Sequence, residues 1–556
     1  MTDAGHLLEV RNLSVEFHTR LGAVQAVRDV SWHVDRGETL AILGESGSGK
    51  SVSAEAVMGL ISSPPGFIRS GEIFYKGRNL LTLGAEDRRQ VNGQGIAMIF
   101  QDPLAALNPV YSVGWQIAEM IRAHGGGGED ARKRTVQLLE RVGIPDPARR
   151  SRDYPHQFSG GQRQRVMIAM AIALQPELLI ADEPTTALDV TVQAQILQLI
   201  KELQSETGMG VVLITHDLGV VAEVADRLAV MKDGQVVETG AAERVFAEPQ
   251  HPYTRQLLSA MPGQQPFRSV SSQTEQPLLA VRDLAKHYDL SFGFFGGTGL
   301  GVVKALDGVS FELRKGETLG IVGESGSGKT TLARTLLGLS DPTGGTALFG
   351  GKPMFGLTGK QLFDLRRRIQ VVFQDPTASL NPRMTVEQII SEPWAIHHGI
   401  VPRERWRGRV KELLEQVGLK PEHADRHPYQ FSGGQRQRIA IARAIAIQPD
   451  LILCDEAVSA LDVSVQAQVI ELLKSLQRQY GLSYLFIAHD LPVVRDFADR
   501  VLVMHRGRIV EQGPTETVFT APADPYTREL LAASPVPDPS HHSKKRLAEA
   551  AATLGR

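Results

Sequence analysis

The stretch Gly44-Glu45-Ser46-Gly47-Ser48-Gly49-Lys50-Ser51 decides the fold of its half of the chain. It fits G-x-x-x-x-G-K-[S/T], in which glycines let backbone N–H groups turn inward around an anion. An apolar run at residues 39–43 precedes this loop, and a helix-compatible segment at residues 51–60 follows it. This context predicts a phosphate-binding loop, the P-loop, whose Lys50 reaches the terminal phosphates and whose Ser51 hydroxyl ligates Mg²⁺.

The P-loop occurs a second time, as Gly323-Glu324-Ser325-Gly326-Ser327-Gly328-Lys329-Thr330. Other segments recur in the same order, with extra residues around 292–301 and fewer near 341–351 in the second half. An internal repeat of this length indicates two like domains. We expect domains at 1–262 and 277–535, a flexible Gln-, Ser- and Pro-rich linker at 263–276, and a flexible tail at 536–556.

Composition excludes several classes of protein. The chain has 556 residues, of which 42% are hydrophobic and 22% charged, with a formal net charge of −2 and no global attraction to nucleic acid. Its single cysteine, Cys454, excludes an intrachain disulfide and a Cys-based zinc or iron–sulfur site. No apolar run approaches the roughly 18–20 residues that cross a bilayer. No signal peptide is expected at residues 1–6, and any membrane role is expected to act through partners.

Strand-like and helix-like segments alternate along each half. Apolar runs at residues 96–100, 178–181 and 211–215 read as buried strands, and residues 131–142 have helical periodicity. Their counterparts lie at residues 369–373, 451–454, 484–488 and 405–417. This alternation predicts an α/β fold with a mostly parallel sheet and a helical insert in each half.

Two carboxylates end an apolar strand in each half: Asp182-Glu183 and Asp455-Glu456. In a parallel sheet this end of the strand lies beside the P-loop. We therefore expect Asp182 and Asp455 to hold Mg²⁺ with Ser51 and Thr330. The adjacent Glu183 and Glu456 are expected to accept a proton from the attacking water.

A second anion site is predicted where a serine precedes two glycines and a helical run. The segments are Ser159-Gly160-Gly161-Gln162 and Ser432-Gly433-Gly434-Gln435. Serine at a helix N-cap followed by two glycines leaves several N–H donors free for an anion.

The order of these motifs resembles the nucleotide-binding domain of ABC ATPases, twice over and across nearly the whole chain. The resemblance implies a RecA-like parallel-sheet core, an antiparallel β subdomain and a helical insert in each domain, with ATP and Mg²⁺ as cofactors. It implies that Gln101 and Gln374 touch Mg²⁺ and a membrane partner, that Ser159 and Ser432 open the signature motifs, and that His216 and His489 hold the γ-phosphate. It also matches residues 187–189 and 460–462 to the D-loop.

Phe17 and Tyr288 fit the aromatic residue that stacks on adenine in that family, although His18 and His287 are adjacent to them. In that family two domains pack head to tail, so Lys50 is expected to work with Ser432, and Lys329 with Ser159, within this one chain. The second half departs from the pattern in having Ala457 where the first has Pro184, but Glu456 is present and activity is expected at both sites.

A narrower resemblance comes from residues 101–109 and 374–382, which read Q-D-P-x-x-x-L-N-P, and from the P-Y-T-R segments at residues 252–255 and 525–528. These resemble the dipeptide/oligopeptide/nickel importer ATPases. Some members carry a Cys-rich cluster after P-Y-T-R, and because this chain has none there we expect no iron–sulfur cluster.

The resemblance implies an ATPase that powers a bacterial importer from the cytoplasmic face of the inner membrane, as a peripheral subunit. Its expected partners are two transmembrane permease subunits and an extracytoplasmic solute-binding protein, with no nucleic acid and no direct insertion into the bilayer. A tandem ABC ATPase acting on ribosomes or DNA is the main alternative, and an exporter ATPase is the third. Peptide, nickel, glutathione-like, glycoside and opine-like solutes stay open.

Overall fold

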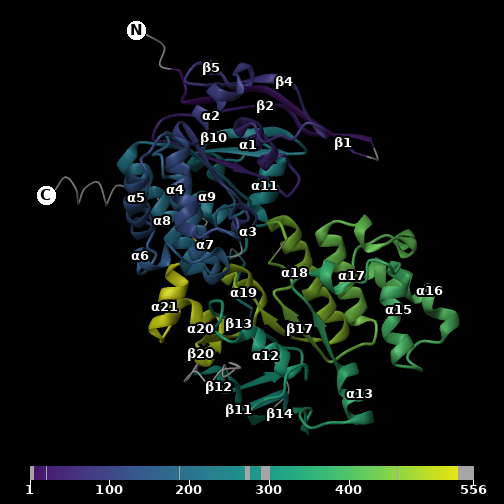
Figure 1. The fold of residues 1–556 in the computed structure, drawn as a ribbon. Helices are drawn as coiled ribbons and strands as arrows, with labels where there is room; N and C mark the ends of the chain where they lie inside the picture. The colour runs from purple at the N-terminus through teal and green to yellow at the C-terminus, as the bar shows by residue number, and fades with distance from the viewer. Residues whose placement is uncertain are drawn as a thin grey trace. The chain divides into compact units, whose positions relative to one another are not determined.

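The computed structural model describes residues 5–19, 22–186, 188–263, 265–268, 276–289, 301–459 and 461–535. Contacts divide the chain into two units: the first comprises the described residues up to Ala260 together with Pro535, and the second spans Met261–Ser534. Both units have the same architecture, drawn in purple to blue for the first and teal to yellow for the second (Figure 1).

The first unit has a six-stranded sheet in the order β10-β9-β3-β8-β7-β6 and a four-stranded antiparallel sheet in the order β2-β1-β4-β5. In the larger sheet only the β9–β10 pair is antiparallel. The strands are β1 Leu8–Thr19, β2 Gly22–Val34, β3 Thr39–Leu43, β4 Gly66–Tyr75, β5 Arg78–Asn79, β6 Ile96–Ile99, β7 Leu178–Asp182, β8 Gly210–Thr215, β9 Arg227–Lys232 and β10 Gln235–Ala241.

Helices of the first unit follow the strands, and α4, α5 and α7 form the helical insert, where they pack together (Figure 1). The helices are α1 Lys50–Met58, α2 Ala85–Gln94, α3 Pro103–Ala106, α4 Val113–Ala123, α5 Gly128–Arg141, α6 Pro147–Arg150, α7 Gly160–Ala171, α8 Val190–Thr207, α9 Leu218–Val224, α10 Ala242–Ala247 and α11 Pro252–Ser259.

The second unit repeats this arrangement, with sheets in the orders β16-β17-β18-β13-β19-β20 and β12-β11-β14-β15. Its strands are β11 Pro277–Asp289, β12 Val302–Arg314, β13 Thr318–Val322, β14 Gly344–Phe349, β15 Lys352–Pro353, β16 Ile369–Val372, β17 Leu451–Asp455, β18 Ser483–Ile487, β19 Arg500–His505 and β20 Arg508–Pro514. Its helices are α12 Lys329–Leu336, α13 Gly359–Arg368, α14 Pro376–Ser379, α15 Val386–Ile396, α16 Trp406–Gln416, α17 Gly433–Ile445, α18 Val463–Tyr480, α19 Leu491–Phe497, α20 Thr515–Thr520 and α21 Pro525–Ala532.

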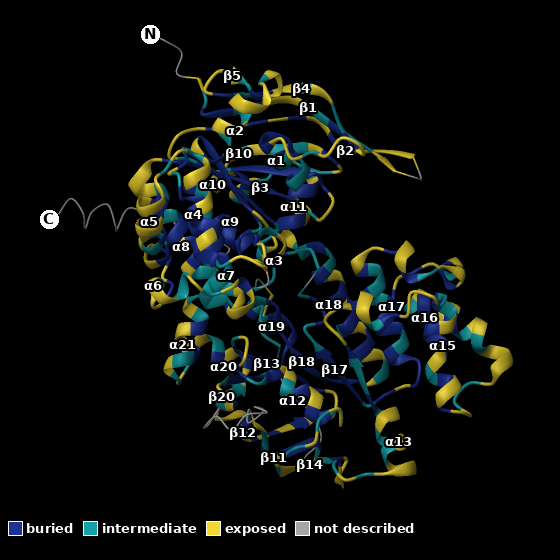
Figure 2. Cartoon of the chain, in the orientation of Figure 1, coloured by how far each residue is buried: buried dark blue, intermediate teal, exposed yellow. Residues whose placement is uncertain are grey.

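The central sheet of each unit is buried on both faces, which explains its continuous apolar runs. Along β7, Leu178 and Ile180 belong to the core shared with α1 and the antiparallel sheet, whereas Leu179 and Ala181 belong to the core under α7 and α8. The strand period of two therefore divides one apolar run between two cores. These strands are dark blue in Figure 2, and the predicted fold class is confirmed.

Cys454 lies in the corresponding strand of the second unit and is completely buried. Burial raises the pKa of its thiol to about 12, so the group stays protonated at neutral pH. A buried thiol of this kind acts as a small apolar residue of the core.

The first residues of the predicted linker bind the second unit. The Gly263 N–H donates to Asp496 Oδ2 at 2.7 Å, and the Arg268 guanidinium donates to the Phe497 carbonyl at 2.7 Å and to Gln477 Oε1 at 2.9 Å. Arg268 Nε also lies 3.6 Å from the buried carboxylate of Asp499. Residues 261–263 and 265–268 thus belong with the second unit. The rest of the predicted linker, apart from Gln276, lies outside the described residues. The predicted tail and most of the inserted segment at 292–301 lie outside them as well.

Replacing Arg268 with alanine should loosen the C-terminal end of α18 and α19, because it leaves Asp499 and the Phe497 carbonyl without this donor. We expect a loss of about 1–3 kcal/mol in the opening free energy of α19, measured by hydrogen exchange of its amides. Arg89→Ala removes a fully solvated ion pair with Glu86 and should leave exchange in α19 unchanged. Equal exchange in wild type and Arg268→Ala would contradict the anchoring.

Candidate functional site: two phosphate loops

Each P-loop is a tight backbone turn between a buried strand and a helix. In the first unit β3 leads into the loop and α1 leaves it, with Gly49 at the N-cap in a left-handed conformation (φ 97°). A Cβ on Gly44 would lie 2.3 Å from the Met231 carbonyl oxygen at the end of β9, so only glycine fits there. Gly323 and Gly328 repeat both features in the second unit.

The P-loop lysines are buried and bonded to their own loops. Lys50 Nζ donates to the carbonyls of Gly44 at 2.7 Å and Glu45 at 2.9 Å, and Lys329 Nζ donates to those of Gly323 at 2.6 Å and Glu324 at 2.9 Å. Both side chains are about 5% exposed. A buried ammonium held inside a ring of backbone groups is a ready partner for a phosphate.

Ser51 and Asp182 meet beside the first P-loop, where the Ser51 hydroxyl donates to Asp182 Oδ1 at 3.1 Å. Burial raises the pKa of Asp182 to about 6, against the opposing effect of that hydrogen bond. The oxygen–oxygen separation matches the roughly 3 Å between adjacent ligands of octahedral Mg²⁺ with bonds of about 2.1 Å. The pair therefore fits a magnesium ion.

The second unit differs at the same place. Asp455 Oδ1 is buried and has no hydrogen-bond partner among the described residues, and burial raises the pKa of this carboxyl. The hydroxyls of Ser48 and Ser327, inside the two P-loops, are likewise buried and unpartnered within the part of the chain that the structure describes. Buried polar atoms left without partners are expected where a ligand completes the site, so both loops fit ATP with Mg²⁺.

Glu183 lies at the centre of a hydrogen-bonded cluster at the end of β7. Its carboxylate accepts from Gln101 Nε2 at 2.7 Å and from the Thr186 hydroxyl at 2.9 Å, and it pairs with His216 Nδ1 at 3.1 Å. Burial by itself raises the pKa of Glu183, but His216 and Thr186 outweigh burial and lower it to about 2. The backbone of Glu183 is left-handed (φ 46°), a conformation that non-glycine residues adopt at a cost.

Glu456 repeats this cluster with one change. It accepts from Gln374 Nε2 at 2.7 Å and lies 3.5 Å from His489 Nδ1, and the His489 hydrogen bond lowers its pKa against the effect of burial. Burial lowers the pKa of His489, but the bond and charge of Glu456 raise it above its ordinary value. Where Thr186 binds the first carboxylate, the Ser459 hydroxyl donates instead to the Glu456 backbone carbonyl at 2.9 Å.

The signature serines are N-caps, as their sequence predicts. The Ser159 hydroxyl accepts from the Gln162 N–H at 3.3 Å, and the Gln162 side chain accepts from the Ser159 N–H at 3.2 Å. Ser432 and Gln435 make the same reciprocal pair at the start of α17. The structure therefore places both signature segments at helix N-termini, where backbone donors are exposed.

The two predicted adenine-stacking residues occupy equivalent positions in the sheets. Phe17 pairs with Val24 across β1 and β2, and Tyr288 pairs with Val303 across β11 and β12. Phe17 packs partly against the core, whereas Tyr288 is 40% exposed and has Lys286 Nζ 5.1 Å from its ring centre. Their stacking role stays a prediction.

The adjacent histidines make their own contacts. His18 Nε2 bonds Glu16 Oε1 at 2.6 Å, and His287 Nε2 lies 3.8 Å from Asp307 Oδ1. Of the D-loop residues, Ala187 and Ala460 lie outside the described residues, while Asp189 and Asp462 precede α8 and α18 as N-caps.

Sequence reasoning missed a contact between each P-loop and the P-Y-T-R segment. The Glu45 N–H donates to the Tyr253 hydroxyl at 3.3 Å, and the Glu324 N–H donates to the Tyr526 hydroxyl at 3.1 Å. The recurrence of P-Y-T-R in both halves was a signal for a shared role, but nothing in its spacing from the P-loop indicates contact. The Thr186 bond to Glu183 was also missed, because it depends on the conformation of the turn after β7.

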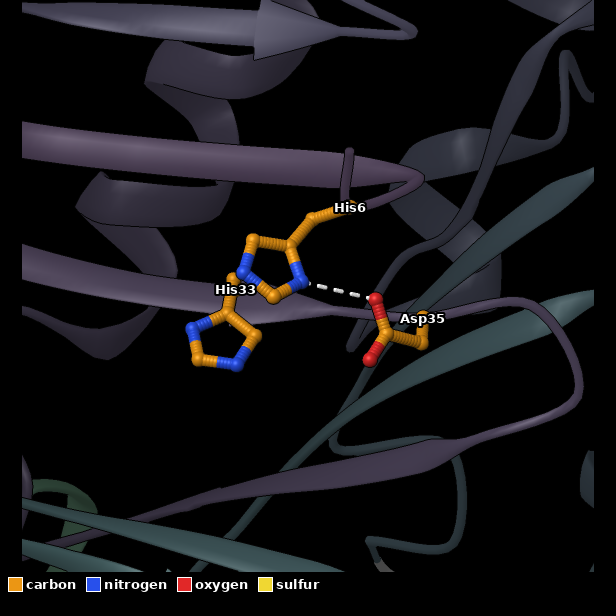
Figure 3. A group of neighbouring side chains, drawn as sticks. All are labelled: His6, His33 and Asp35. Carbon is orange, nitrogen blue, oxygen red and sulfur yellow. Dashed lines mark hydrogen bonds and ion pairs between the residues drawn. The ribbon is translucent and has the colours of Figure 1, made fainter. Parts of the chain in front are cut away.

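Three potential metal ligands gather at another place in the first unit, around His6, His33 and Asp35 (Figure 3). His6 Nδ1 is hydrogen-bonded to Asp35 Oδ1 at 2.8 Å, and the two imidazole rings stack with centres 3.7 Å apart. Arg227 bonds the His33 carbonyl, and its charge adds to burial in lowering the pKa of His33. A hydrogen bond and a ring stack account for this group, so we assign no ion to it.

Comparison with known proteins identifies the family to which the chain is similar. A model of the ABC transporter family matches residues 27–186 and 306–459, and a model of the oligopeptide/dipeptide transporter C-terminal region matches residues 237–284 and 510–555. The glutathione import ATP-binding protein GsiA of Salmonella paratyphi A is 50% identical over 575 residues, covering 98% of this chain and 92% of that protein. GsiA of Escherichia coli strain K12 is 49% identical with the same coverage. The solved structure of cbiO1 from Clostridium perfringens is 30% identical, covers 44% of this chain and 92% of its own, and has a TM-score of 0.39.

The chain belongs to the ABC transporter family, as an ATPase with two ATP-binding domains and the C-terminal region of oligopeptide and dipeptide transporters. ABC ATPases bind ATP, generally with Mg²⁺, and membership in a transporter family implies membrane permease partners and association with a membrane. Within the described ranges, no helix has the length and apolar character that crossing a bilayer requires. The two GsiA relatives are import ATP-binding proteins, and the alternative of a ribosome- or DNA-acting ATPase has no support from them.

The two signature glycines of the first unit should respond differently to alanine. A Cβ on Gly160 would have Leu188 at 3.9 Å as its nearest neighbour, whereas a Cβ on Gly161 would lie 2.5 Å from Val192 Cγ1. We expect Gly161→Ala to destabilise the protein by about 1–3 kcal/mol through overpacking and Gly160→Ala to leave thermal unfolding unchanged. Equal melting temperatures for the two variants would contradict the packing of α7 against α8.

Proposed function

We propose that this chain is the ATP-hydrolysing subunit of a bacterial importer for a small peptide or a peptide-like solute. The observation that carries this proposal is the sequence identity of 50% and 49% to two glutathione import ATP-binding proteins, over 98% of this chain. The duplicated P-loop, acidic pair and histidine support ATP hydrolysis in both domains. Glutathione is the first solute to test.

The residues of each unit have distinct parts in this proposal. In the first unit the P-loop amides and Lys50 bind the phosphates, and the magnesium ion is held by Ser51, Asp182 and Gln101. In the second unit the P-loop amides and Lys329 bind the phosphates, and the magnesium ion is held by Thr330, Asp455 and Gln374. Bound Mg²⁺ neutralises phosphate charge and orients the leaving group. Signature residues Ser159 to Gln162 and Ser432 to Gln435 bind the γ-phosphate of the other domain's nucleotide, as the resemblance implies.

Glu183 and Glu456 are proposed as the general bases. A carboxylate with a pKa near 2 is ionised at neutral pH but accepts a proton weakly. Since His216 and Thr186 lower the pKa of Glu183, a turn of His216 toward the nucleotide would raise the proton affinity of this base.

The proposed partners are two permease subunits and an extracytoplasmic solute-binding protein, and the proposed location is the cytoplasmic face of the inner membrane. A tagged copy of the chain, purified from gently solubilised membranes, should bring two permease proteins with it. Reconstituted with them, its ATPase rate should rise when glutathione or a short peptide is supplied with the binding protein. Recovery of ribosomal proteins or DNA in place of permeases would refute the proposal.

Glu183→Gln combined with Glu456→Gln should abolish ATP turnover while leaving ATP binding intact. Glutamine keeps the size of the side chain and one acceptor oxygen but cannot accept the proton from water. We expect a fall in kcat of about 10²–10⁴-fold, measured by phosphate release, with bound ATP retained on the protein. Gln198→Glu, on the surface of α8, serves as a control and should keep wild-type turnover. Wild-type hydrolysis by the double variant would remove the two carboxylates from the mechanism.

The pairing of Lys50 with Ser432 and of Lys329 with Ser159 is also proposed. Lys50→Ala with Ser432→Arg places both changes in one ATP site, so photolabelling by an ATP analogue should fall by about half. Lys50→Ala with Ser159→Arg damages both sites, and labelling should be lost. Equal residual labelling in the two double variants would show that the domains do not share their sites in this way.

A further inference from the structure

We propose that Tyr253 and Tyr526 are positioning residues that hold the two P-loops in the form that binds nucleotide. Through them the helices α11 and α21, far along the chain from the loops, set the ATP affinity of their own domains. The inference rests on the P-loops being the ATP sites, as the proposed function requires, and does not depend on which solute is transported.

In the first unit one P-loop residue links the tyrosine to the lysine. The Glu45 N–H donates to the Tyr253 hydroxyl at 3.3 Å, while the Glu45 carbonyl accepts from Lys50 Nζ at 2.9 Å. Tyr253 is 5% exposed, and Lys232 Nζ lies 4.8 Å from the centre of its ring. The hydroxyl thus fixes the residue whose carbonyl orients the P-loop lysine.

The second unit makes the same connection independently. The Glu324 N–H donates to the Tyr526 hydroxyl at 3.1 Å, and the Glu324 carbonyl accepts from Lys329 Nζ at 2.9 Å. Here the tyrosine ring lies against His505, with ring centres 3.9 Å apart. Because the ring contact differs while the hydroxyl bond is the same in both units, the hydroxyl is the shared element.

The tyrosines are themselves held by an anchored helix start. In the first unit the Glu238 carboxylate on β10 accepts the backbone N–H groups of Gln250 at 2.8 Å and His251 at 3.0 Å. Glu511 on β20 accepts those of Ala523 at 2.8 Å and Asp524 at 3.1 Å. A charged acceptor with two backbone donors is a strong anchor, so the position of each tyrosine is set by the adjoining hairpin.

The same hairpin also holds the P-loop directly. The Gly234 N–H, in the turn between β9 and β10, donates to the Ser48 carbonyl at 3.1 Å, and the Gly507 N–H donates to the Ser327 carbonyl at 2.9 Å. Tyrosine and hairpin turn therefore fix two points of the loop. The side-chain hydroxyls of the same two residues, Ser48 and Ser327, are buried and have no partner among the described residues, as is expected where a ligand completes a site.

Replacing both tyrosines with phenylalanine tests the proposal. Each ring stays in place, while the Glu45 and Glu324 amides lose their acceptors and the loops lose one restraint. We expect the ATP KM, and the Kd for a non-hydrolysable ATP analogue, to rise about 2- to 10-fold, with kcat within about 2-fold of wild type. A positioning role moves KM and Kd in this way, whereas general destabilisation lowers kcat and the melting temperature together.

Two controls separate the outcomes. Tyr484→Phe removes another buried tyrosine hydroxyl, which donates to the Leu473 carbonyl at 3.0 Å, and should leave the ATP KM unchanged. In a Lys50→Ala background, where only the second P-loop binds tightly, Tyr526→Phe should weaken analogue binding and Tyr253→Phe should not.

The proposal is overturned if the double phenylalanine variant binds the analogue like wild type, or if Tyr484→Phe gives the same shift. It is equally overturned if Tyr253→Phe and Tyr526→Phe act alike in the Lys50→Ala background. A wild-type chain that binds no ATP would refute the ATP sites themselves, which is a separate failure.

Discussion

Burial of the central sheet on both faces is the constraint on which the site depends. Each strand divides its apolar side chains between two cores, so polar groups are tolerated only where the strands end. In the first unit the P-loop follows β3, Asp182 ends β7, and Gln101 and His216 follow β6 and β8 within two residues. These strands are parallel to one another, so their carboxyl ends, and all of these groups with them, lie at one edge of the sheet.

The two units share this edge but not all of its hydrogen bonds. A serine hydroxyl satisfies Asp182, whereas Asp455 has a bare buried oxygen among the described residues. Glu183 has a hydroxyl donor that Glu456 lacks, since Ser459 binds the backbone instead of the carboxylate. The carboxylates of the two sites therefore differ in their hydrogen bonds although the architecture is the same.

Most of the fold and the central residues of the site were predictable because they depend on local pattern. The strand ends, the glycine loops and the serine N-caps follow from short-range sterics and hydrogen bonding, and the repeat doubles the signal. The contacts of Tyr253 and Arg268 were not predictable, because each joins segments that are far apart in the sequence and that only packing brings together. The bond from Thr186 to Glu183 is local, but it depends on the conformation of the turn after β7, which no sequence pattern reveals. The contacts of the first residues of the predicted linker with the second unit were not predictable either. The polar composition of this segment does not show that Gly263 and Arg268 contact carboxylates of the second unit.

The left-handed backbone at Glu183 and Glu456 has a consequence for how this protein can be altered. A residue other than glycine in that conformation costs of order 1 kcal/mol or more, and the hydrogen bonds that each carboxylate accepts offset this cost. Glycine at position 183 would relieve the backbone, but it would leave Gln101 Nε2 and His216 Nδ1 without their partner. An engineered thermostable form therefore has to keep these two positions fixed, because a strained backbone and the hydrogen bonds that hold it meet in one residue of each domain.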